Sequence, residues 1–281
     1  MKVKDAIRFI IDSSGDIYSP GEIESIAFIA LDFIGFPRKK IFQNADEEIK
    51  SSDEEFIKKI AKEIKTSRPI QYILGETEFL GLKFIVNNDV LVPRQETEEL
   101  VLRIIAENKK LKPVLLDLGT GSGCIAITLA KKIPDSIVYA CDVSVPALLI
   151  AKHNAELNNV EINSFEQDML QGKFEKVGYC DIIVSNPPYV LESEKIHMHS
   201  NVLNFEPQLA LFVKDEDPLI FYKAIADIAT HKLSVNGVLY VEINENFAHE
   251  VVELFTSVGL CDIEIIRDIH DKNRFVKAVK H

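Results

Sequence analysis

The chain has 281 residues, of which 47% are hydrophobic and 27% are charged. This is the composition of a folded globular protein, so fibrous and disordered classes are excluded, and the length allows one large domain or two smaller ones. The 32 basic and 44 acidic side chains give a net charge of −12. A field of that sign repels phosphate, so the composition offers no general attraction to nucleic acid or to an anionic membrane.

The sequence predicts a cytoplasmic protein that does not cross a membrane. No apolar stretch reaches the ~18 residues of a membrane span, and the best candidate, residues 25–36, is interrupted by Asp32. The first residues lack the long apolar segment of a secretion signal.

Neither the cysteines nor the histidines have the spacing of a metal site. The cysteines stand far apart, which indicates reduced and mostly buried thiols. They are Cys124, Cys141, Cys180 and Cys261. His197 and His199 have no third ligand with supporting spacing, so we expect no metal and place them in a loop over the substrate.

Residues 1–70 have the apolar pattern of amphipathic helices, with a period of 3.6 residues. The periodic segments are residues 7–11, 23–31 and 56–64. Ser19 and Glu22 have the spacing of a capping box, with a proline at the first helical position, and residues 51–54 supply another N-cap candidate. The sequence therefore predicts a small helical domain over residues 1–70.

Residues 71–92 change to β-branched and aromatic types punctuated by glycine. Two runs in this segment, residues 72–74 and 79–86, favour strands, and Asn87-Asn88-Asp89 favours a turn. We therefore expect a β-hairpin linker over residues 71–92, between the helical domain and the rest of the chain.

From residue 93 to residue 281, short apolar strands alternate with helical patterns. The strand-like segments are 114–118, 137–141, 181–185 and 238–242, counted as the first, second, fourth and fifth strands, and a third strand precedes residues 167–169. This βαβα order predicts an α/β, doubly wound, mostly parallel sheet that binds its ligands at the carboxyl ends of the strands. Residues 261–266 and 275–279 are joined by a loop too short for a crossover helix, so we expect an antiparallel edge hairpin there.

Three glycines follow the first of these strands directly, in Asp117-x-Gly119-x-Gly121-x-Gly123. Glycine lets the backbone turn sharply and approach a ligand without a Cβ atom, and the N–H groups at the next helix start can bind polar groups. The spacing differs from the G-x-G-x-x-G pattern of dinucleotide-binding proteins. A tight turn without a ligand is the alternative interpretation.

Two further positions indicate a nucleoside. Asp142 stands nineteen residues after Gly123 and ends the second strand, where a carboxylate can accept both hydroxyls of a free ribose. A helix cap or a surface acid is the alternative. At the third strand, residues 167–169 place a polar side chain and the apolar Met169 where an adenine would lie, with an ordinary loop as the alternative.

The strongest chemical signal is Asn186-Pro187-Pro188-Tyr189, which follows the fourth strand. Each proline fixes φ and lacks an N–H, so the loop is stiff and its carbonyls are available as acceptors. Asn186 Oδ1 and the Pro187 carbonyl can then hold both hydrogens of a planar –NH₂ group, with Tyr189 packed on its plane. Such a pocket selects amides and exocyclic amines. The alternative is a rigid turn at the strand end.

These two motifs together resemble the class I S-adenosylmethionine-dependent methyltransferases that modify planar amino or amide nitrogens. Other segments are similar to one family of that class, the peptide-chain release factor glutamine N5-methyltransferases. The segments are residues 68–75, 79–82, 90–98, 205–207 and 210–211. The resemblance runs from about Arg68 to Arg274.

The resemblance implies methyl transfer from S-adenosylmethionine to the glutamine side chain in the Gly-Gly-Gln motif of release factors, with S-adenosylhomocysteine as product. The implied cofactor site comprises Gly119, Thr120, Gly121, Ser122, Gly123, Asp142, Met169 and Asn186. The implied glutamine pocket comprises Asn186, Pro187, Pro188 and Tyr189, with Asn186, Pro187 and Tyr189 as the catalytic residues. The helical domain is expected to help hold the release factor.

The chain departs from the family at two positions, where Asn244 replaces the glycine of Glu-Ile-Gly and Met169 replaces a larger aromatic. Both changes affect local pocket shape. Just before the predicted helix at residue 95, we expect Arg94, Glu96 and Glu98 to cap the helix or pair internally, or alternatively to shape the glutamine pocket.

Two other functions remain alternatives. An N6-adenine nucleic-acid methyltransferase would present an exocyclic amine to the same acceptors, but the net charge of −12 disfavours it. A non-catalytic S-adenosylmethionine-binding protein would have no use for an amine-binding loop. We therefore expect a release factor as protein partner, with no direct binding to nucleic acid.

Overall fold

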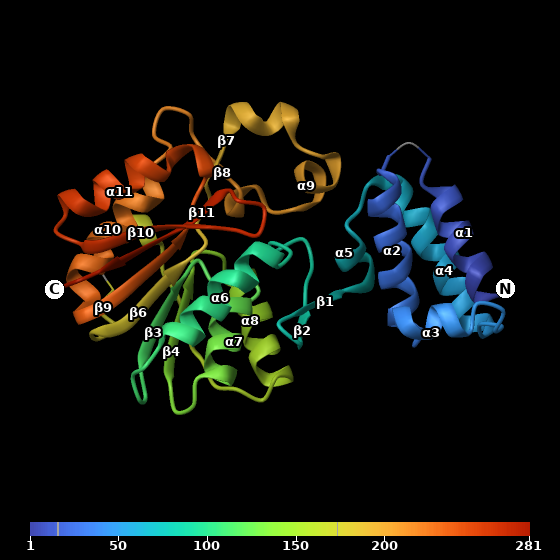
Figure 1. Cartoon of the computed structure of the whole chain (residues 1–281), viewed down its shortest axis with the longest axis horizontal. Coiled ribbons are helices and arrows are strands. Elements are labelled where there is room, and N and C mark those ends of the chain that lie inside the picture. Colours follow the sequence, from blue (N-terminus) through green and yellow to red (C-terminus); the bar gives the residue numbers. More distant parts are fainter. Residues whose placement is uncertain (16, 173) are drawn as a thin grey trace. The chain divides into compact units, whose positions relative to one another are not determined.

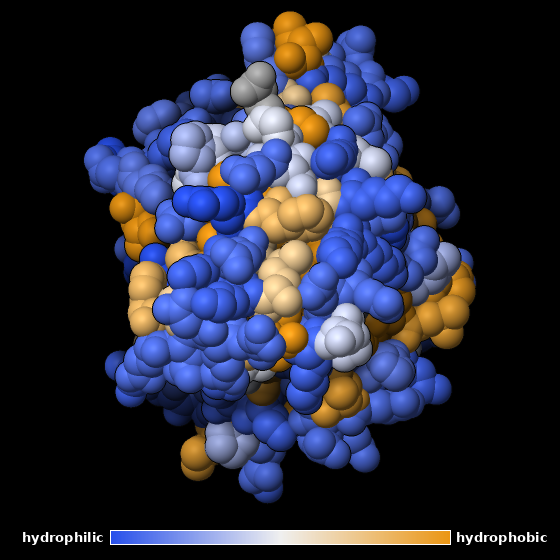
Figure 2. Space-filling model, turned by 90° about the vertical axis from the view of Figure 1, so that its right-hand side faces the viewer, coloured by the Kyte–Doolittle hydropathy of each residue, from blue (hydrophilic) through white to orange (hydrophobic). Residues whose placement is uncertain are grey.

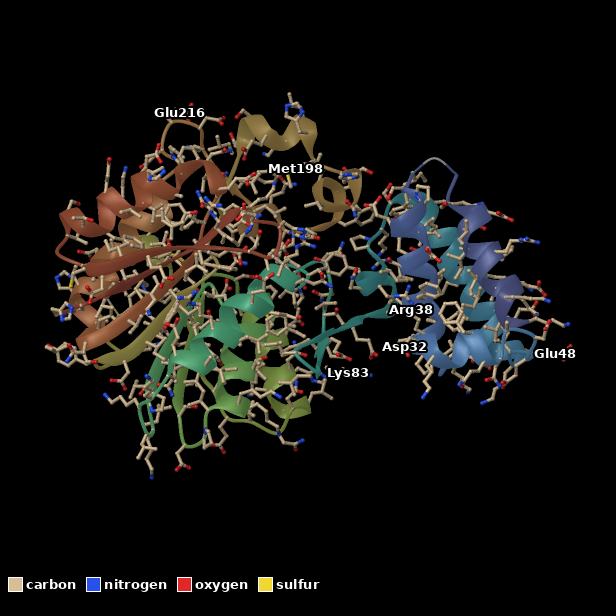
Figure 3. The ribbon with its side chains drawn as sticks, in the orientation of Figure 1. Asp32, Arg38, Glu48, Lys83, Met198 and Glu216 are labelled. Atoms are coloured by element: carbon tan, nitrogen blue, oxygen red, sulfur yellow. The ribbon has the colours of Figure 1, made fainter. Side chains whose placement is uncertain are left out.

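A computed structural model of the protein describes residues 1–15, 17–172 and 174–281. The described chain divides into two compact units. The helical unit consists of Met1–Glu76 and His199–Phe205, and the sheet unit consists of Thr77–Met198 and Glu206–His281. Met198, labelled in Figure 3, is the last residue of the sheet unit before the chain enters the helical unit for the second time.

The helical unit contains the three helices that the apolar period predicts. Its elements are α1 (Val3–Ser13), α2 (Pro20–Phe33), α3 (Arg38–Gln43), α4 (Ser51–Glu63), η1 (Ile64–Thr66), α5 (Ile70–Leu74) and α9 (Ser200–Phe205) (Figure 1). The predicted periodic segments lie in α1, α2 and at the end of α4, and their aliphatic side chains form one buried cluster. Amphipathic helices of this length are stabilised mainly by such packing.

Of the two predicted helix caps, one is confirmed and one is wrong. The Glu22 N–H donates to Ser19 Oγ at 3.4 Å and the Ser19 N–H donates to Glu22 Oε2 at 2.9 Å, which completes the capping box of α2. Helix α4 begins at Ser51 without a side-chain cap. Its acidic first turn is used differently, because Glu54 accepts from the ammonium group of Met1 at 2.8 Å.

The strand predicted at residues 72–74 is wrong, because these residues lie in α5. Pro69 precedes this short helix and Gly75 ends it with a φ of 78°. A proline before the first turn and a left-handed glycine after the last one delimit a helical turn, and they outweigh the β propensity of the residues between them. The hairpin itself is shorter than expected and consists of β1 (Glu76–Phe79) and β2 (Leu82–Ile85).

The hairpin is packed onto the sheet unit by aromatic and amide side chains. Phe79 and Phe84 are buried with their rings edge to face, 6.1 Å apart. On α8, Asn154 accepts from the Ile85 N–H at 2.7 Å and donates to the Ile85 carbonyl at 3.0 Å, like a neighbouring strand. The segment after β2 is thereby fixed beside the sheet.

The predicted α/β doubly wound sheet with an antiparallel edge hairpin is confirmed (Figure 1). Its strand order is β10-β11-β9-β6-β3-β4-β5. The strands are β3 (Val114–Leu118), β4 (Ile137–Asp142), β5 (Asn163–Glu166), β6 (Cys180–Ser185), β9 (Leu233–Glu242), β10 (Cys261–Arg267) and β11 (Asn273–Val279). The five from β9 to β5 are parallel, while β11 pairs antiparallel with both β9 and β10.

Helices cover both faces of this sheet (Figure 1). One face carries α6 (Gln95–Glu107), α7 (Cys124–Lys132) and α8 (Val145–Leu157), and the other carries α10 (Ile220–Lys232) and α11 (Ala248–Ser257). Shorter elements connect them. These are η2 (Met169–Gln171), β7 (Val190–Leu191), η3 (Glu192–His197), η4 (Gln208–Ala210), β8 (Phe212–Val213) and η5 (Glu245–Phe247).

The apolar strands alternate between two buried clusters, one on each face of the sheet. In β3, Leu115 belongs to one cluster and Leu116 to the other, and Ile182 and Ile183 divide in the same way in β6. Successive side chains of a strand point to opposite faces, so a parallel sheet covered on both sides has continuous apolar strands. Each fully buried leucine or isoleucine contributes about 1.5–3 kcal/mol.

The surface of the helical unit is mainly hydrophilic, with apolar side chains among the polar ones (Figure 2). Phe33 and Phe42 are 42% and 70% exposed. Phe33 stacks on Phe56 with the ring centroids 5.2 Å apart, and the Arg38 guanidinium lies 4.9 Å from the centroid of Phe28 (Figure 3 labels Arg38). The helical unit therefore has exposed aromatic rings on its surface and an arginine side chain close to another aromatic ring.

Within the described residues, no helix has both the length and the apolar character needed to span a membrane. All four cysteines are free thiols, as predicted. Cys141 and Cys180 are buried, while Cys124 and Cys261 are partly buried. The burial of these side chains gives them a packing role that requires no disulfide.

Candidate active site

A cavity of about 230 Å³ opens at the carboxyl ends of the parallel strands. This is the edge where doubly wound sheets bind ligands. The turn after β3, the end of β4 and the loop after β6 form three of its walls. Residues of the segment 89–94, of η2, of α10, of the stretch 207–210 and of the first turns of α6, α7 and α8 complete the lining.

The glycine-rich turn after β3 forms the wall expected from its sequence. Gly119 and Gly121 have φ values of 75° and 53°, in the left-handed region that favours glycine. A Cβ atom on Gly119 would stand 3.2 Å from Met169 Cε. The residues of this turn that line the cavity are Gly119, Thr120, Gly121 and Ser122.

Gly123 differs from the other two glycines because it does not belong to the cavity lining. Its φ is 82°, and a Cβ atom there would stand 2.7 Å from Ile127 Cδ1 and 3.1 Å from Ala151 Cβ. Gly123 therefore permits the start of α7 to pack closely against α8.

The Asp142 carboxylate is held at the cavity by the backbone. Its Oδ2 accepts from the Gly121 N–H at 2.8 Å and its Oδ1 accepts from the Ser144 N–H at 2.9 Å. Burial raises the pKa of this carboxyl above its ordinary value. The cap of α8 is Ser144, whose Oγ accepts from the Ala147 N–H, so the helix-cap alternative for Asp142 is wrong.

Asp117, at the end of β3, is a buried carboxylate with one unused oxygen. It is 1% exposed, and its Oδ2 accepts from Thr120 Oγ1 at 2.7 Å. Its Oδ1 has no hydrogen-bond partner among the described residues. Burial raises the pKa of Asp117 to about 7. A cationic group in the adjacent cavity would stabilise the charged form of this side chain.

Residues 167–169 follow β5 and reach the cavity. Met169 is 8% exposed and lines it beside Gly119. Asp168 accepts from the Leu170 N–H at 2.9 Å and so caps η2. The apolar side chain is thereby held at the wall where the sequence predicts an adenine.

The loop Asn186-Pro187-Pro188-Tyr189 follows β6 and divides into two layers. Asn186 and Pro188 line the cavity, whereas Pro187 and Tyr189 are not part of its lining. Asn186 Nδ2 donates to Thr97 Oγ1 at 3.3 Å. With its nitrogen held there, Asn186 has Oδ1 to offer to a ligand as an acceptor.

Two residues that the sequence analysis did not select are bonded to this loop, and one of them, Thr97, also lines the cavity. Thr97 Oγ1 donates to Glu242 Oε2 at 2.9 Å, and Tyr189 Oη donates to Glu242 Oε1 at 3.0 Å. Glu242 ends β9 and is 1% exposed. Burial raises the pKa of Glu242, and the hydroxyls of Thr97 and Tyr189 oppose that rise. Thr97 stands in a segment that carries the family resemblance, and Glu242 is the glutamate of the family's Glu-Ile-Gly, but neither residue type indicates a role by itself.

Asn244, at the position of the family's glycine, anchors the same loop. Its Nδ2 donates to the Tyr189 carbonyl at 3.2 Å, and its Oδ1 accepts from the Asn246 N–H at 3.0 Å. The departure therefore adds a hydrogen bond to the substrate side of the site.

Of the roles expected for Arg94, Glu96 and Glu98, the structure shows internal pairing for Arg94, and none of the described side chains caps α6. Arg94 Nη2 contacts both carboxylate oxygens of Glu206, at 2.8 and 2.6 Å, and Glu98 accepts from the Leu80 N–H. Burial raises the pKa of Glu206, and Arg94 opposes that rise. This ion pair joins two cavity walls, because Arg94 ends the segment 89–94 and Glu206 precedes the stretch 207–210.

His197 and His199 belong to different units of the described chain. His197 ends η3 in the sheet unit, whereas His199 precedes α9 in the helical unit. No group of three or more His, Cys, Asp or Glu side chains among residues 1–15, 17–172 and 174–281 is placed to hold a metal ion.

Comparison with known proteins assigns the chain to a family. Residues 96–204 match the family described as methyltransferase small domain. The chain is 43% identical to the release factor glutamine methyltransferase of Flavobacterium psychrophilum over 283 residues, which cover 99% of each chain. It is 41% identical to the enzyme of the same name from Bacteroides thetaiotaomicron, over 96% of this chain and 97% of that one. The chain belongs to the release factor glutamine methyltransferase family.

A solved structure of a methyltransferase from Pyrococcus furiosus has the same fold. It is 18% identical to this chain, covers 72% of it and 90% of its own length, and has a TM-score of 0.53. The family resemblance predicted from the motifs is confirmed, and the chain is a methyltransferase.

Proposed function

We propose that this protein transfers a methyl group from S-adenosylmethionine to the side-chain amide nitrogen of the glutamine in the Gly-Gly-Gln motif of peptide-chain release factors. Its two similar relatives are named for that modification. The observation that carries the proposal is Asn186, which lines the cavity with its nitrogen bound to Thr97 and its oxygen available to an N–H donor. In a cell, the enzyme would meet this substrate in the cytoplasm, where translation takes place.

The residues at the glycine-rich turn fit S-adenosylmethionine. The left-handed glycines leave the space that a Cβ atom on Gly119 would fill. Asp142 has two oxygens that each use one acceptor site on a backbone N–H, so each retains capacity for a ribose hydroxyl. Asp117 has a buried oxygen without a partner, which suits a ligand that carries a cationic ammonium group. Met169 offers an apolar surface to the adenine.

In this proposal, the chain acts by holding and polarising the substrate amide. When bound, S-adenosylmethionine supplies an electrophilic methyl group whose C–S bond breaks as the new C–N bond forms, and the sulfur leaves as a neutral thioether. Asn186 Oδ1 and the Pro187 carbonyl accept the two N–H groups of the glutamine amide. They stabilise the positive charge that develops on nitrogen, and one of these protons is then released to water.

Tyr189 and Pro188 complete the proposed glutamine pocket. Glu242 accepts a hydrogen bond from the Tyr189 hydroxyl at 3.0 Å, which fixes the position of the ring. The ring of Tyr189 and the face of Pro188 are apolar surfaces against which a planar amide can pack. This arrangement needs neither a metal nor a covalent enzyme intermediate.

We assign residues 1–70 to substrate docking, 71–92 to the linker and 93–281 to the methyltransferase domain. The exposed aromatic rings of the helical unit, with Arg38 close to Phe28, support a protein-binding role for the first segment. Large apolar side chains with an adjacent arginine are typical of protein interfaces.

The proposal is tested by methyl transfer from labelled S-adenosylmethionine to a purified, unmethylated bacterial release factor. A factor in which the glutamine of Gly-Gly-Gln is changed to alanine and duplex DNA serve as parallel acceptors. Label on the unaltered factor alone is the expected result. Label on DNA alone would establish a nucleic-acid methyltransferase, and cofactor binding without any transfer would establish a non-catalytic binding protein.

A further inference from the structure

Thr97 and Glu242 are buried and bonded to the loop after β6; Thr97 also lines the cavity, whereas Glu242 does not. On the basis of the function proposed above, we propose that they are positioning residues that set the orientation of the Asn186 amide. Together they hold the nitrogen of Asn186 away from the substrate, so that Oδ1 and not Nδ2 meets the glutamine amide.

Three hydrogen bonds fix which atom donates and which accepts in this network. An ionised carboxylate has no proton to donate, so Glu242 accepts from both the Thr97 and the Tyr189 hydroxyls, at 2.9 and 3.0 Å. A threonine hydroxyl has one proton. Because Thr97 gives it to Glu242, its oxygen can only accept at 3.3 Å from Asn186. Asn186 must therefore present its NH₂ group to Thr97.

The orientation of the Asn186 amide determines whether Oδ1 or the NH₂ group faces the substrate glutamine. A glutamine NH₂ group needs acceptors, and Asn186 supplies one only when Oδ1 is directed to it. With the Asn186 amide reversed, its NH₂ group would face the NH₂ group of the glutamine, and Asn186 would offer the substrate no acceptor. Glu242 thus determines, through Thr97, whether the loop after β6 is able to bind the group that is methylated.

Burial raises the pKa of Glu242, and the two hydroxyls that donate to it oppose that rise by stabilising the ionised carboxylate. Besides Thr97 and Tyr189, the charged and titratable side chains that act on it are Arg274 on β11 and Glu96 on α6, and its charge in turn acts on Tyr222 on α10. Arg274 favours the charged carboxylate and Glu96 opposes it.

Replacement of Glu242 by glutamine gives a sharp test, because the side chain keeps its shape and gains an NH₂ group. If the new NH₂ group donates to Thr97, the new side-chain carbonyl accepts from the Tyr189 hydroxyl. The Thr97 hydroxyl then donates to Asn186 Oδ1, so both hydroxyl protons in the network have an acceptor. If Asn186 keeps its original orientation, the Tyr189 proton loses its acceptor. The reversed amide is therefore favoured in Glu242→Gln.

We expect Glu242→Gln to lower kcat for release-factor methylation by about 10- to 100-fold, the effect of one unmade buried hydrogen bond. Affinity for S-adenosylmethionine and the melting temperature should change little. Glu107→Gln is the matched control. Glu107 also accepts a tyrosine hydroxyl, from Tyr240 at 2.8 Å, but it lines a separate cavity that includes no residue of the proposed site.

Thr97 provides an independent test. Thr97→Val keeps the shape but removes the hydroxyl, so Asn186 loses the partner of its nitrogen, and kcat should fall by about 10-fold or more. Thr97→Ser keeps the hydroxyl and should retain most of the activity. A structural role alone would lower the melting temperature in proportion to the loss of kcat.

The activity of the unaltered enzyme distinguishes failure of the proposed function from failure of the positioning role. Failure of the unaltered enzyme to methylate the release factor would overturn the proposed function. With that activity present, normal kcat in both Glu242→Gln and Thr97→Val would overturn the positioning role. A loss of kcat in Thr97→Ser equal to that in Thr97→Val would also overturn it, because the hydroxyl would then not be what matters.

Discussion

The two loops that meet at the cavity are held in different ways. The glycine-rich turn after β3 is fixed mainly by local backbone contacts, with the Gly119 and Thr120 N–H groups both donating to the Cys141 carbonyl at 2.9 Å on the adjacent strand. The Asn186–Tyr189 loop after β6 is fixed by side chains. Its partners Thr97 and Glu242 lie 89 and 53 residues away in the sequence.

This difference separates a general property of the fold from the specificity of the family. A turn held by its own backbone can bind a nucleoside with few requirements on the rest of the chain. A loop that must present one acceptor in one orientation needs buried groups from α6 and β9. Changes to the substrate loop should therefore affect turnover, whereas changes to the glycine turn should affect cofactor affinity.

Loss of the Asn186 amide is the largest effect that the comparison predicts. Asn186→Ala removes one of the two proposed acceptors, so kcat should fall by about 10²–10³-fold, or about 2.7–4 kcal/mol in the transition state, by analogy with a preorganised oxyanion-hole group. The measurement is single-turnover methylation of the release factor at saturating S-adenosylmethionine. Near-normal turnover would remove Asn186 from the reaction.

The same contrast explains what the sequence alone could reveal. The strands, the edge hairpin and the glycine turn were predictable because each depends on residues close together in the chain, such as Gly119, Gly121 and the apolar residues of β3. The Glu242–Thr97–Asn186 network was not, because a threonine in a helix and a glutamate at a strand end have no local signature. Tertiary contact alone gives them their role.

Helix α5 and Arg94 show the same limit. Residues 72–74 have β propensity, but Pro69 and Gly75 confine them to a helical turn. Arg94 has nearby acidic residues in the sequence, yet its partner is Glu206, 112 residues away. In both cases a local preference was present, and a boundary signal or a distant partner outweighed it.

The Arg94–Glu206 pair should make the largest contribution to stability among the contacts between cavity walls. Arg94→Ala leaves the Glu206 side chain, 2% exposed, without its cation, which should lower the free energy of unfolding by about 3 kcal/mol. Arg103→Ala is the control, because Arg103 and its partner Glu264 are 32% and 47% exposed. It should lower stability by about 1 kcal/mol or less.

Urea unfolding measures how much the free energy of unfolding falls in each of the two arginine variants. Equal losses for Arg94→Ala and Arg103→Ala would contradict the role of the buried pair. A change in kcat without a change in stability would instead assign Arg94 directly to the glutamine pocket, which is the alternative that the sequence left open.

A methyl group on the glycine turn should weaken cofactor binding more than turnover. Gly119→Ala places a Cβ atom 3.2 Å from Met169 Cε at a φ of 75°. We expect about 1–2 kcal/mol of lost stability from the left-handed backbone, and affinity for S-adenosylmethionine lowered by about 10-fold, which corresponds to 1.4 kcal/mol. Calorimetric titration with S-adenosylmethionine measures that affinity.

Gly259→Ala is the control that separates the effect of a methyl group in the cavity from the effect of an alanine at a left-handed backbone position. Gly259 has a φ of 87°, and an added Cβ atom there meets nothing within 4 Å. Its stability should fall as in Gly119→Ala, but its cofactor affinity should not change. If both variants lose affinity equally, the turn after β3 contributes only to folding.

Asp117 should give an effect that depends on pH, and it tests whether the glycine turn depends on its backbone alone. Burial raises the pKa of this carboxyl from 3.8 to about 7. The folded protein therefore binds a proton more tightly than the unfolded chain, so the stabilising contribution is complete below about pH 4 and is lost as the pH rises through about 7. Asp117→Asn lacks this titration while retaining an acceptor for Thr120. The free energy of unfolding of the unaltered protein should thus decline relative to that of Asp117→Asn as the pH rises through this window.

The two stability curves, measured by urea unfolding from about pH 4 to about pH 8, decide the point. A difference that grows with pH means that the charge on Asp117 has no partner in the free enzyme and is available to a cationic ligand. Parallel curves would mean that Asp117 Oδ1 finds a partner in solution. The glycine turn would then, like the Asn186–Tyr189 loop, depend on a contact beyond its own backbone, and the separation between a cofactor side and a substrate side would weaken.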